Sequence, residues 1–484
     1  MWGMEFKKEL IGILPEIALF CFALVSLLLG AFLKGASRRI TGYIGLLGYV
    51  VAFFTIFPSG TETFKAFYGM VSFDPFSLFF KVLFLVIGFL VVLLSLDYTK
   101  KEEVGFGEYY ALILIATCGM ILMAASSNFV TLFLGLEIMS LSIYALTGIT
   151  REDPRSVEAA FKYFLLGAFA SAFFLYGVAL LYVSTGTLDL MAFGQLLKSK
   201  AQVLKDPTFL VGLGLLLVGF GFKLAFVPFH MWTPDVYEGA PTPITAFMAT
   251  GVKAAAFAGF LRVLLFALPS LPFKWQEVLW VLSVATMSLG NLVALRQDDI
   301  KRMLAYSSIA HAGYILIGII AGPERGYSGA LFYLYAYAFM NIGAFAVVAI
   351  LSKKGHPNTV LEAYSGIASR HPLLALSMTI FLFSLAGVPP TAGFMAKFYV
   401  FSAAVKEGYI WLAVLGVLNS AVAAYYYLRV MVYMYFREPK WEIQTGSASL
   451  AGVLVIILSL WGVLQFGILP SSLLALAQTS LRLL

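Results

Sequence analysis

Long apolar runs follow one another along almost the whole chain, and they limit what it can fold into. A helix needs about 20 apolar residues to cross roughly 30 Å of hydrocarbon. Fourteen runs approach this length between charged or Pro- and Gly-rich breaks: 10–33, 40–58, 76–96, 108–126, 128–149, 157–184, 208–230, 241–267, 276–295, 300–321, 327–352, 371–404, 409–436 and 448–470. The sequence therefore predicts an all-α polytopic membrane protein with about 14 transmembrane helices.

The composition excludes a soluble protein. Of 484 residues, 61% are hydrophobic and 12% are charged, whereas soluble domains carry about 25% charged residues. The longest connections between runs, about 185–207 and 353–370, are too short to fold as separate domains. We therefore expect neither a nucleotide nor a redox site of the usual kind. Cys21 and Cys118 lie in apolar runs and the four His are scattered, so no metal site is expected.

The distribution of Lys and Arg predicts the orientation of the chain. With fourteen helices both termini lie on one side, and the loops on the other side carry more Lys and Arg. Cytoplasmic loops of membrane proteins are enriched in these residues. We therefore expect both termini on the non-cytoplasmic side of the membrane.

Four charged residues fall well inside the apolar runs: Glu137, Lys223, Lys253 and Lys397. Each charge near a helix centre costs about 2.5–3.5 kcal/mol on insertion scales, or about 10–14 kcal/mol for four. One interpretation is that internal ion pairs fix the register of the helices. The other is that titratable groups carry ions across the membrane, and the size of the cost favours it.

Protons fit this set of charges better than metal cations do. A nearby carboxylate keeps a buried lysine charged, so a carboxylate that moves can make the lysine bind or release a proton. A sodium site would favour clustered carboxylates and carbonyl oxygens. Glu137 is the one acid among the four central charges, so the sequence favours proton transfer.

His311 is a candidate relay in the tenth run. Ser307, Ser308 and Tyr314 lie at i−4, i−3 and i+3 from it, on one helical face. Histidine is suited to proton transfer near neutral pH. The alternative is a hydrogen-bonded histidine that packs two helices, and the sequence leaves both open.

Further candidates lie nearer the ends of the runs. His230, seven residues after Lys223, suits either a relay or a surface role. Glu158 and Lys162 are spaced i,i+4, which favours a salt bridge at the membrane surface over a relay. Two arginines near helix ends are expected to snorkel towards the membrane surface: Arg262 and Arg429.

Two proline breaks predict a hidden repeat. Pro228 follows Lys223 by five residues, and Pro389-Pro390 precede Lys397 by seven or eight. These breaks fall in runs seven and twelve, an odd number of helices apart, so equivalent helices would be inverted. The prediction is two inverted five-helix repeats, helices 4–8 and 9–13. The corresponding division of the chain is 1–107 for helices 1–3, 108–267 and 276–436 for the repeats, and 437–484 for helix 14.

Five segments carry a resemblance to a known family: GLEIMSLSIYALTG, RSVEAAFKYFLLGAFASAFFLYGVALLY, KLAFVPFHMWTPDVYEGAPTPITAFMATGVKAAAF, MLAYSSIAHAGYILIG and FSLAGVPPTAGFMAKFYVF. They resemble the antiporter-like membrane subunits of proton-pumping NADH:quinone oxidoreductase (respiratory complex I), and within that family the N subunits. The family also includes the L and M subunits and Mrp-type Na⁺/H⁺ antiporters. The resemblance covers nearly the whole chain and implies the same fourteen-helix plan.

The resemblance also implies roles for individual residues. Glu137 matches the glutamate of helix five and Lys223 the lysine of helix seven, whose pairing sets the pump. Lys253 matches the connecting lysine of helix eight, and Lys397 the terminal charge of helix twelve. A lysine at this last position is similar to the N and L subunits but not to M.

The resemblance adds two possible relays and the partners. Glu158 and His311 resemble proton-path residues of the family. NADH, FMN, iron–sulfur clusters and quinone are implied in partner subunits, with no cofactor or metal in this chain. The expected partners are other membrane-arm subunits and the lipid bilayer, not nucleic acid. The alternatives are an Mrp-type Na⁺/H⁺ antiporter subunit, an architectural subunit with structural ion pairs, and a carrier of an organic solute.

Overall fold

The computed structural model describes residues 7, 9–33, 39–57, 63–102, 104, 107–268, 273–352, 358–439 and 449–482. The ends of some predicted runs and the loop charges at 34–38, 353–354 and 440 lie outside them. The helices are α2 (Leu14–Phe32), α3 (Ile40–Phe54), α4 (Pro75–Glu102), α5 (Gly107–Ala125), α6 (Phe129–Thr147), α7 (Pro154–Thr185), α8 (Leu190–Ser199), η3 (Ala201–Lys205), α9 (Pro207–Leu224), α10 (Thr233–Gly239), α11 (Thr242–Phe247), η4 (Met248–Val252), α12 (Lys253–Arg262), η5 (Val263–Ala267), α13 (Phe273–Ala294), α14 (Ile300–Ile320), α15 (Gly326–Leu351), η6 (Leu361–Tyr364), α16 (Ile367–Arg370), α17 (Pro372–Ala386), α18 (Ala392–Lys406), α19 (Ile410–Phe436), α20 (Leu450–Ile468) and α21 (Ser471–Arg482).

The all-α membrane fold predicted from the sequence is confirmed. In the described part of the chain, 12 helices are long and apolar enough to cross a membrane, the continuous segment α11–η5 counting as one. Two shorter apolar helices, α3 and α17, account for the other predicted runs. The count of fourteen and the inverted repeats stay predictions.

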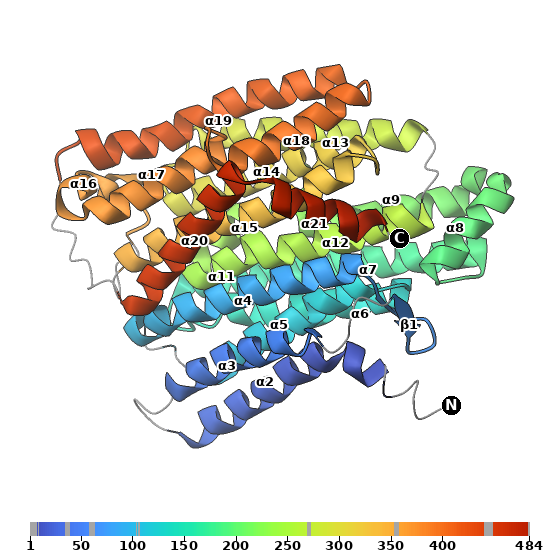
Figure 1. The fold of residues 1–484 in the computed structure, drawn as a ribbon, viewed down its shortest axis with the longest axis horizontal. Helices are drawn as coiled ribbons and strands as arrows, with labels where there is room; N and C mark the ends of the chain where they lie inside the picture. The colour runs from blue at the N-terminus through green and yellow to red at the C-terminus, as the bar shows by residue number, and fades with distance from the viewer. Residues whose placement is uncertain are drawn as a thin grey trace.

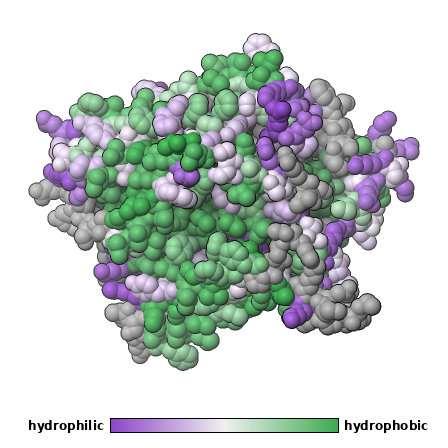
Figure 2. Space-filling model, viewed as in Figure 1, coloured by the Kyte–Doolittle hydropathy of each residue, from purple (hydrophilic) through white to green (hydrophobic). Residues whose placement is uncertain are grey.

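The long helices lie side by side, as expected when each backbone must satisfy its own hydrogen bonds in lipid (Figure 1). α2 and α3 form one edge, α13 and α19 the opposite edge, and α15 and the segment α11–η5 are buried between them. The face shown in Figure 2 has a broad apolar band, with polar residues gathered at its two ends. This distribution matches a membrane protein whose loops lie at both surfaces.

A small β-hairpin lies beside the helices. Its strands are β1 (Phe64–Ala66) and β2 (Val71–Phe73), which pair antiparallel with Phe64 opposite Phe73. Val71 also forms a bridge with Ser126, at the turn between α5 and α6. β2 ends two residues before α4 begins, so the hairpin leads the chain directly into this central helix.

The two predicted helix breaks are present, but both begin before the prolines. α9 ends at Leu224, and Ala225 follows with a φ of 58°. α17 ends at Ala386, and Gly387 follows with a φ of 91°. A residue in the left-handed region commonly ends a helix, and proline often follows one or two positions later because it cannot continue the helix. Pro228, Pro389 and Pro390 thus lie in the non-helical segments after the helix ends.

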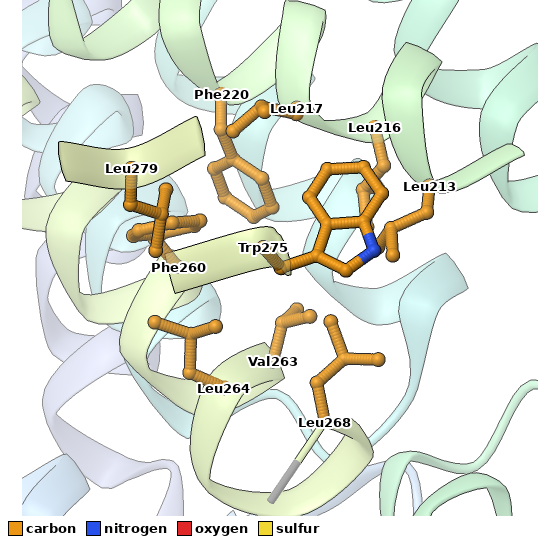
Figure 3. A pocket seen from close by; sticks show the side chains of 10 residues that line it. All are labelled: Leu213, Leu216, Leu217, Phe220, Phe260, Val263, Leu264, Leu268, Trp275 and Leu279. Carbon is orange, nitrogen blue, oxygen red and sulfur yellow. The ribbon is translucent and has the colours of Figure 1, made fainter. Parts of the chain in front are cut away.

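α9, α12 with η5, and α13 meet around an apolar pocket (Figure 3). Phe220 of α9, Phe260 of α12 and Trp275 of α13 are among the side chains that line it. The remaining lining residues are Leu and Val. The helices on either side of the loop before α13 therefore meet here through apolar packing.

Candidate functional site

Lys223 lies in the last turn of α9, directly before the first break, and is 2% exposed. Its ammonium donates a hydrogen bond to the Tyr144 hydroxyl at 3.0 Å. The same nitrogen lies 5.0 Å from the centre of the Tyr144 ring and 5.5 Å from that of Tyr163. Aromatic rings attract a cation, so the Lys223 ammonium is buried among one hydroxyl partner and several aromatic rings.

Glu137 lies on α6 seven residues before Tyr144, and its side chain is half-buried. Its carboxylate accepts a hydrogen bond from the Ser171 hydroxyl of α7. Within the described residues it forms no ion pair with Lys223 shorter than 4 Å. The pairing implied by the resemblance is therefore not a direct contact in this structure.

Lys253 is the first residue of α12, directly after the π-helical turn η4. It is buried, and its ammonium donates to both the hydroxyl and the backbone carbonyl of Ser308, at 2.5 Å each. Ser308 belongs to α14, so this contact joins the segment α11–η5 to the helix that carries His311.

His311 is buried in the middle of α14 and is hydrogen-bonded through both ring nitrogens. Nδ1 lies 2.7 Å from the Tyr333 hydroxyl of α15, and Nε2 lies 3.3 Å from the Tyr427 hydroxyl of α19. The Tyr427 hydroxyl in turn bonds the Ser307 hydroxyl. Hydroxyl groups both donate and accept, so a proton can enter or leave the imidazole on either side.

Lys397 lies on α18, just beyond the second break, and is buried. Its ammonium donates to the carbonyl of Ala386 at 2.9 Å, the last residue of α17. That carbonyl has no partner within its own helix because the helix ends there. The ammonium also lies 4.8 Å from the centre of the Tyr314 ring.

One face of α14 therefore connects two of the buried lysines. Ser308 contacts Lys253, His311 follows one turn later, and Tyr314 contacts Lys397 another turn on. Six residues separate Ser308 from Tyr314, which is about 9 Å along the helix axis. Ser308, His311 and Tyr314 thus lie along one face of α14 between the two lysines, while the ring nitrogens of His311 bond tyrosines of α15 and α19.

The row continues into a network of amide and hydroxyl groups. Asn291 of α13 donates to the Tyr314 hydroxyl at 2.9 Å and accepts from the Tyr426 hydroxyl at 3.0 Å. Asn291 also donates to Asn419 of α19, which donates to Ser288. These side chains were not predicted from the sequence, because separately they are ordinary polar residues in apolar helices.

Glu158 and His230 lie away from this row. Glu158 is 63% exposed and pairs with Lys162 at 2.7 Å, as their spacing predicts. His230 lies in the break after α9, and it is buried with no hydrogen-bond partner at Nδ1. The structure therefore brings His311 to the buried lysines, but not these two residues.

Glu158 belongs instead to a chain of ion pairs at the N-terminal end of α7. Lys162 also pairs with Asp235 of α10 at 2.7 Å, and Asp235 pairs with Arg302 of α14 at 2.7 Å. Arg302 completes the chain with Glu238 at 2.6 Å. Partial burial alone would raise the pKa of Asp235, but the hydrogen bonds from Lys162 and Arg302 hold it below its ordinary value.

The structure corrects the prediction that Arg262 snorkels. Arg262 is 1% exposed and binds both carboxylate oxygens of Asp74, at 2.6 and 2.8 Å. Its Nε also donates to the carbonyl of Ala124 at 2.7 Å. A planar guanidinium matches a carboxylate in this two-pronged way, so Arg262 has a buried partner and need not reach the surface. Arg429 does reach towards it, bonding the exposed Asp298.

A second, partly buried pair was also not predicted from the sequence. Lys81 of α4 pairs with Glu16 of α2 at 3.0 Å and donates to the carbonyl of Gly12. Lys81 is the sixth residue of the predicted run 76–96. A charge inside an apolar run was the sequence feature that could have identified it. Both missed pairs join helices outside the row on α14.

The described residues contain no group of three His, Cys, Asp or Glu side chains that could hold a metal ion. Cys21 and Cys118 are free thiols. The polar groups of the site are ammonium, imidazole, hydroxyl and amide groups, which suit proton transfer through hydrogen bonds.

Comparisons with known proteins agree with this chemistry. A family profile described as "NADH:quinone oxidoreductase/Mrp antiporter, TM" matches residues 126–423. NADH-quinone oxidoreductase subunit N of Trichlorobacter lovleyi is 50% identical over 98% of this chain and 97% of that protein. The subunit N of Chloroflexus aggregans is 44% identical over 97% of this chain and 96% of that protein.

Solved structures share the fold. A chain of respiratory complex I from Thermus thermophilus is 37% identical, with a TM-score of 0.81 over 95% of this chain and 98% of that one. A chain of an archaeal membrane-bound sulfane sulfur reductase is 28% identical, with a TM-score of 0.83 over 98% of this chain and 96% of that one. A chain of the Mrp complex from Dietzia is 22% identical, with a TM-score of 0.81 over 96% of this chain and 97% of that one. At this identity it shows a shared fold alone. This chain therefore belongs to the antiporter-like family of membrane subunits, alongside the N subunits of NADH-quinone oxidoreductase.

Proposed function

We propose that this chain carries protons across the membrane as a membrane-arm subunit of an NADH:quinone oxidoreductase. The observation that supports this most strongly is the row on α14, where Ser308 bonds Lys253, His311 lies one turn further on, and the ring of Tyr314 lies beside Lys397. A purely architectural subunit would gain little from burying lysines without carboxylate partners, because each uncompensated charge is costly. Lys253, His311 and Lys397 are the groups along this row that bind and release protons.

In this proposal Glu137 and Lys223 form the entry half and Lys397 the exit half. Lys253 and His311 pass protons between the two halves. Glu158 relays protons at the surface, and His230 relays them in the break after α9. Glu137 is half-buried on α6, apart from Lys223, so a change in its charge would act on Lys223 through space. NADH, FMN, iron–sulfur clusters and quinone belong to partner subunits, and their redox chemistry drives the charge changes.

The proposal includes the place of the chain in the cell. It would lie in the inner membrane of a bacterium, beside other antiporter-like and small membrane subunits. Both termini would lie on the non-cytoplasmic side, as the distribution of Lys and Arg between the loops predicts. Labelling of single cysteines placed at each terminus, in intact cells and in inverted vesicles, would test this orientation.

The function is tested in the assembled complex reconstituted into vesicles, with NADH and quinone added and proton uptake recorded. We expect Lys223→Ala and Lys397→Ala each to abolish most proton pumping. Lys406→Ala is the matched control, because Lys406 is an exposed lysine on the same helix as Lys397. Pumping by Lys223→Ala or Lys397→Ala at the level of the control would contradict the proposal. Proton exchange that requires added Na⁺ and no NADH would favour the antiporter alternative.

A further inference from the structure

Two of the buried lysines have the same kind of partner. Lys223 and Lys397 lie next to the two helix breaks, and within the described residues neither has a carboxylate within 4 Å. Each ammonium lies near a tyrosine ring: that of Lys223 bonds the Tyr144 hydroxyl and lies 5.0 Å from the centre of its ring, and that of Lys397 lies 4.8 Å from the centre of the Tyr314 ring. Lys223 also donates to a hydroxyl and Lys397 to a carbonyl, as Lys253 does, but Lys253, which is not at a break, has no such ring contact among the described residues. Ring contact therefore distinguishes the lysines at the breaks.

The two tyrosines also occupy matching places in the chain. Tyr144 lies on α6, two membrane-spanning segments before Lys223 on α9. Tyr314 lies on α14, again two segments before Lys397 on α18. The separations along the chain are similar, 79 residues (223 − 144) and 83 residues (397 − 314). A lysine beside a tyrosine two segments earlier thus occurs at both breaks, with Lys223 on the helix before its break and Lys397 on the helix after its break.

We propose that Tyr144 and Tyr314 are positioning residues whose rings hold the ammonium groups of Lys223 and Lys397 in place beside the helix breaks. A ring face attracts the charged form of lysine but offers no base to take its proton. A carboxylate at the same place would bind the ammonium more tightly and hold its proton. The ring therefore holds the charge in position and leaves the proton free to be transferred.

The hydroxyl groups of the two tyrosines differ, which allows a sharper test. The Tyr314 hydroxyl accepts from Asn291 at 2.9 Å and does not bond Lys397. The Tyr144 hydroxyl accepts from Lys223 at 3.0 Å. Removing the hydroxyl alone should therefore matter little at Tyr314 and more at Tyr144, whereas removing the ring should matter at both.

The inference rests on the proposed function, and the same vesicle assay tests both, with pumping normalised to the amount of assembled complex. We expect Tyr314→Leu and Tyr144→Leu to lower proton pumping about fivefold, because cation–π attraction of 0.5–2 kcal/mol corresponds to about a two- to thirtyfold change in occupancy. Tyr314→Phe should remain within about twofold of the wild type, and Tyr144→Phe should fall between. Tyr335→Leu is the matched control, since Tyr335 is a buried tyrosine whose hydroxyl bonds the carbonyl of Phe79.

Two results would overturn the inference. One is pumping by both leucine variants at the level of Tyr335→Leu, and the other is a fall of Tyr314→Phe to the level of Tyr314→Leu. If a leucine variant does not assemble, methionine at the same position has a similar volume and a more adaptable side chain without a ring, and answers the same question. Lys397→Ala is run in parallel: normal pumping by this variant contradicts the proposed function itself, whereas loss of pumping there with normal leucine variants contradicts only the role of the rings.

Discussion

Breaking the ion pair between Arg262 and Asp74 is expected to cost more stability than breaking any surface ion pair among the described residues. Both side chains are 1% exposed. Besides the two bonds from Arg262, the carboxylate accepts from the Ser72 hydroxyl at 2.8 Å and from the backbone N–H of Ser77 at 2.7 Å. The substitution Asp74→Asn keeps the size of the side chain and removes its charge. It leaves the guanidinium of Arg262 buried without a counter-charge.

The loss of stability expected for Asp74→Asn follows from the burial of both charges. Removing one partner of a buried ion pair costs about 3–5 kcal/mol, because the other charge stays out of water unpaired. The double variant Asp74→Asn with Arg262→Gln removes both charges, and the amide of the glutamine takes the chain position of Nε, which bonds the carbonyl of Ala124. Since a neutral hydrogen bond contributes about 0.5–1.5 kcal/mol, the double variant should recover most of the stability lost by the single one.

The free energy of unfolding of the full chain can be measured in mixed detergent micelles, with fluorescence of the seven tryptophans as the signal. Asp298→Asn is the matched control, because Asp298 also pairs with an arginine, Arg429, but is 75% exposed. An exposed pair contributes about 0–1 kcal/mol. The reasoning is refuted if Asp74→Asn costs no more than Asp298→Asn, or if the double variant is as unstable as Asp74→Asn.

Two further predictions concern a glycine and a surface carboxylate. Gly387→Ala should lower proton pumping, since a Cβ there would lie 3.0 Å from Cδ of Lys397; Gly408→Ala, with a similar φ of 84° and nothing within 4 Å, should not. Equal pumping by the two variants would show that the position of Lys397 is not affected. The pKa of Asp235 is lowered in the folded chain, so its ion pairs stabilise the fold above the unfolded pKa of about 4, and this contribution is lost as pH falls through the folded value. Thermal unfolding at pH 7 and pH 3 should therefore show a smaller loss for Asp235→Asn than for the wild type, and an equal loss would contradict the assignment.

The apolar pattern was sufficient to predict the membrane helices and the two breaks, because length and hydrophobicity act along the chain. It also identified Lys223, Lys253 and Lys397, since a charge deep in an apolar run is visible without knowing its surroundings. What the pattern does not contain is the direction in which a side chain points and what lies opposite. Arg262 was misplaced for that reason, because its partner is 188 residues away in the sequence.

The prolines illustrate a second limit. A proline in an apolar run indicates a break, but the helix ends where a residue can adopt a left-handed conformation and satisfy the last carbonyls. Ala225 does so at the first break although alanine rarely adopts a positive φ. The position of Lys223 in the last turn, and not in the middle, of its helix could therefore not be predicted.

The two charges of α12 have a geometric consequence for the whole molecule. Lys253 and Arg262 are nine residues apart in a regular α-helix, so they point about 180° away from each other and lie about 13 Å apart along the axis. Lys253 reaches α14, whereas Arg262 reaches Asp74 at the start of α4. A rotation of α12 about its own axis that took Lys253 away from Ser308 would also pull Arg262 off its carboxylate. The ion pair between Arg262 and Asp74 thus restrains rotation of α12 and keeps Lys253 directed towards α14.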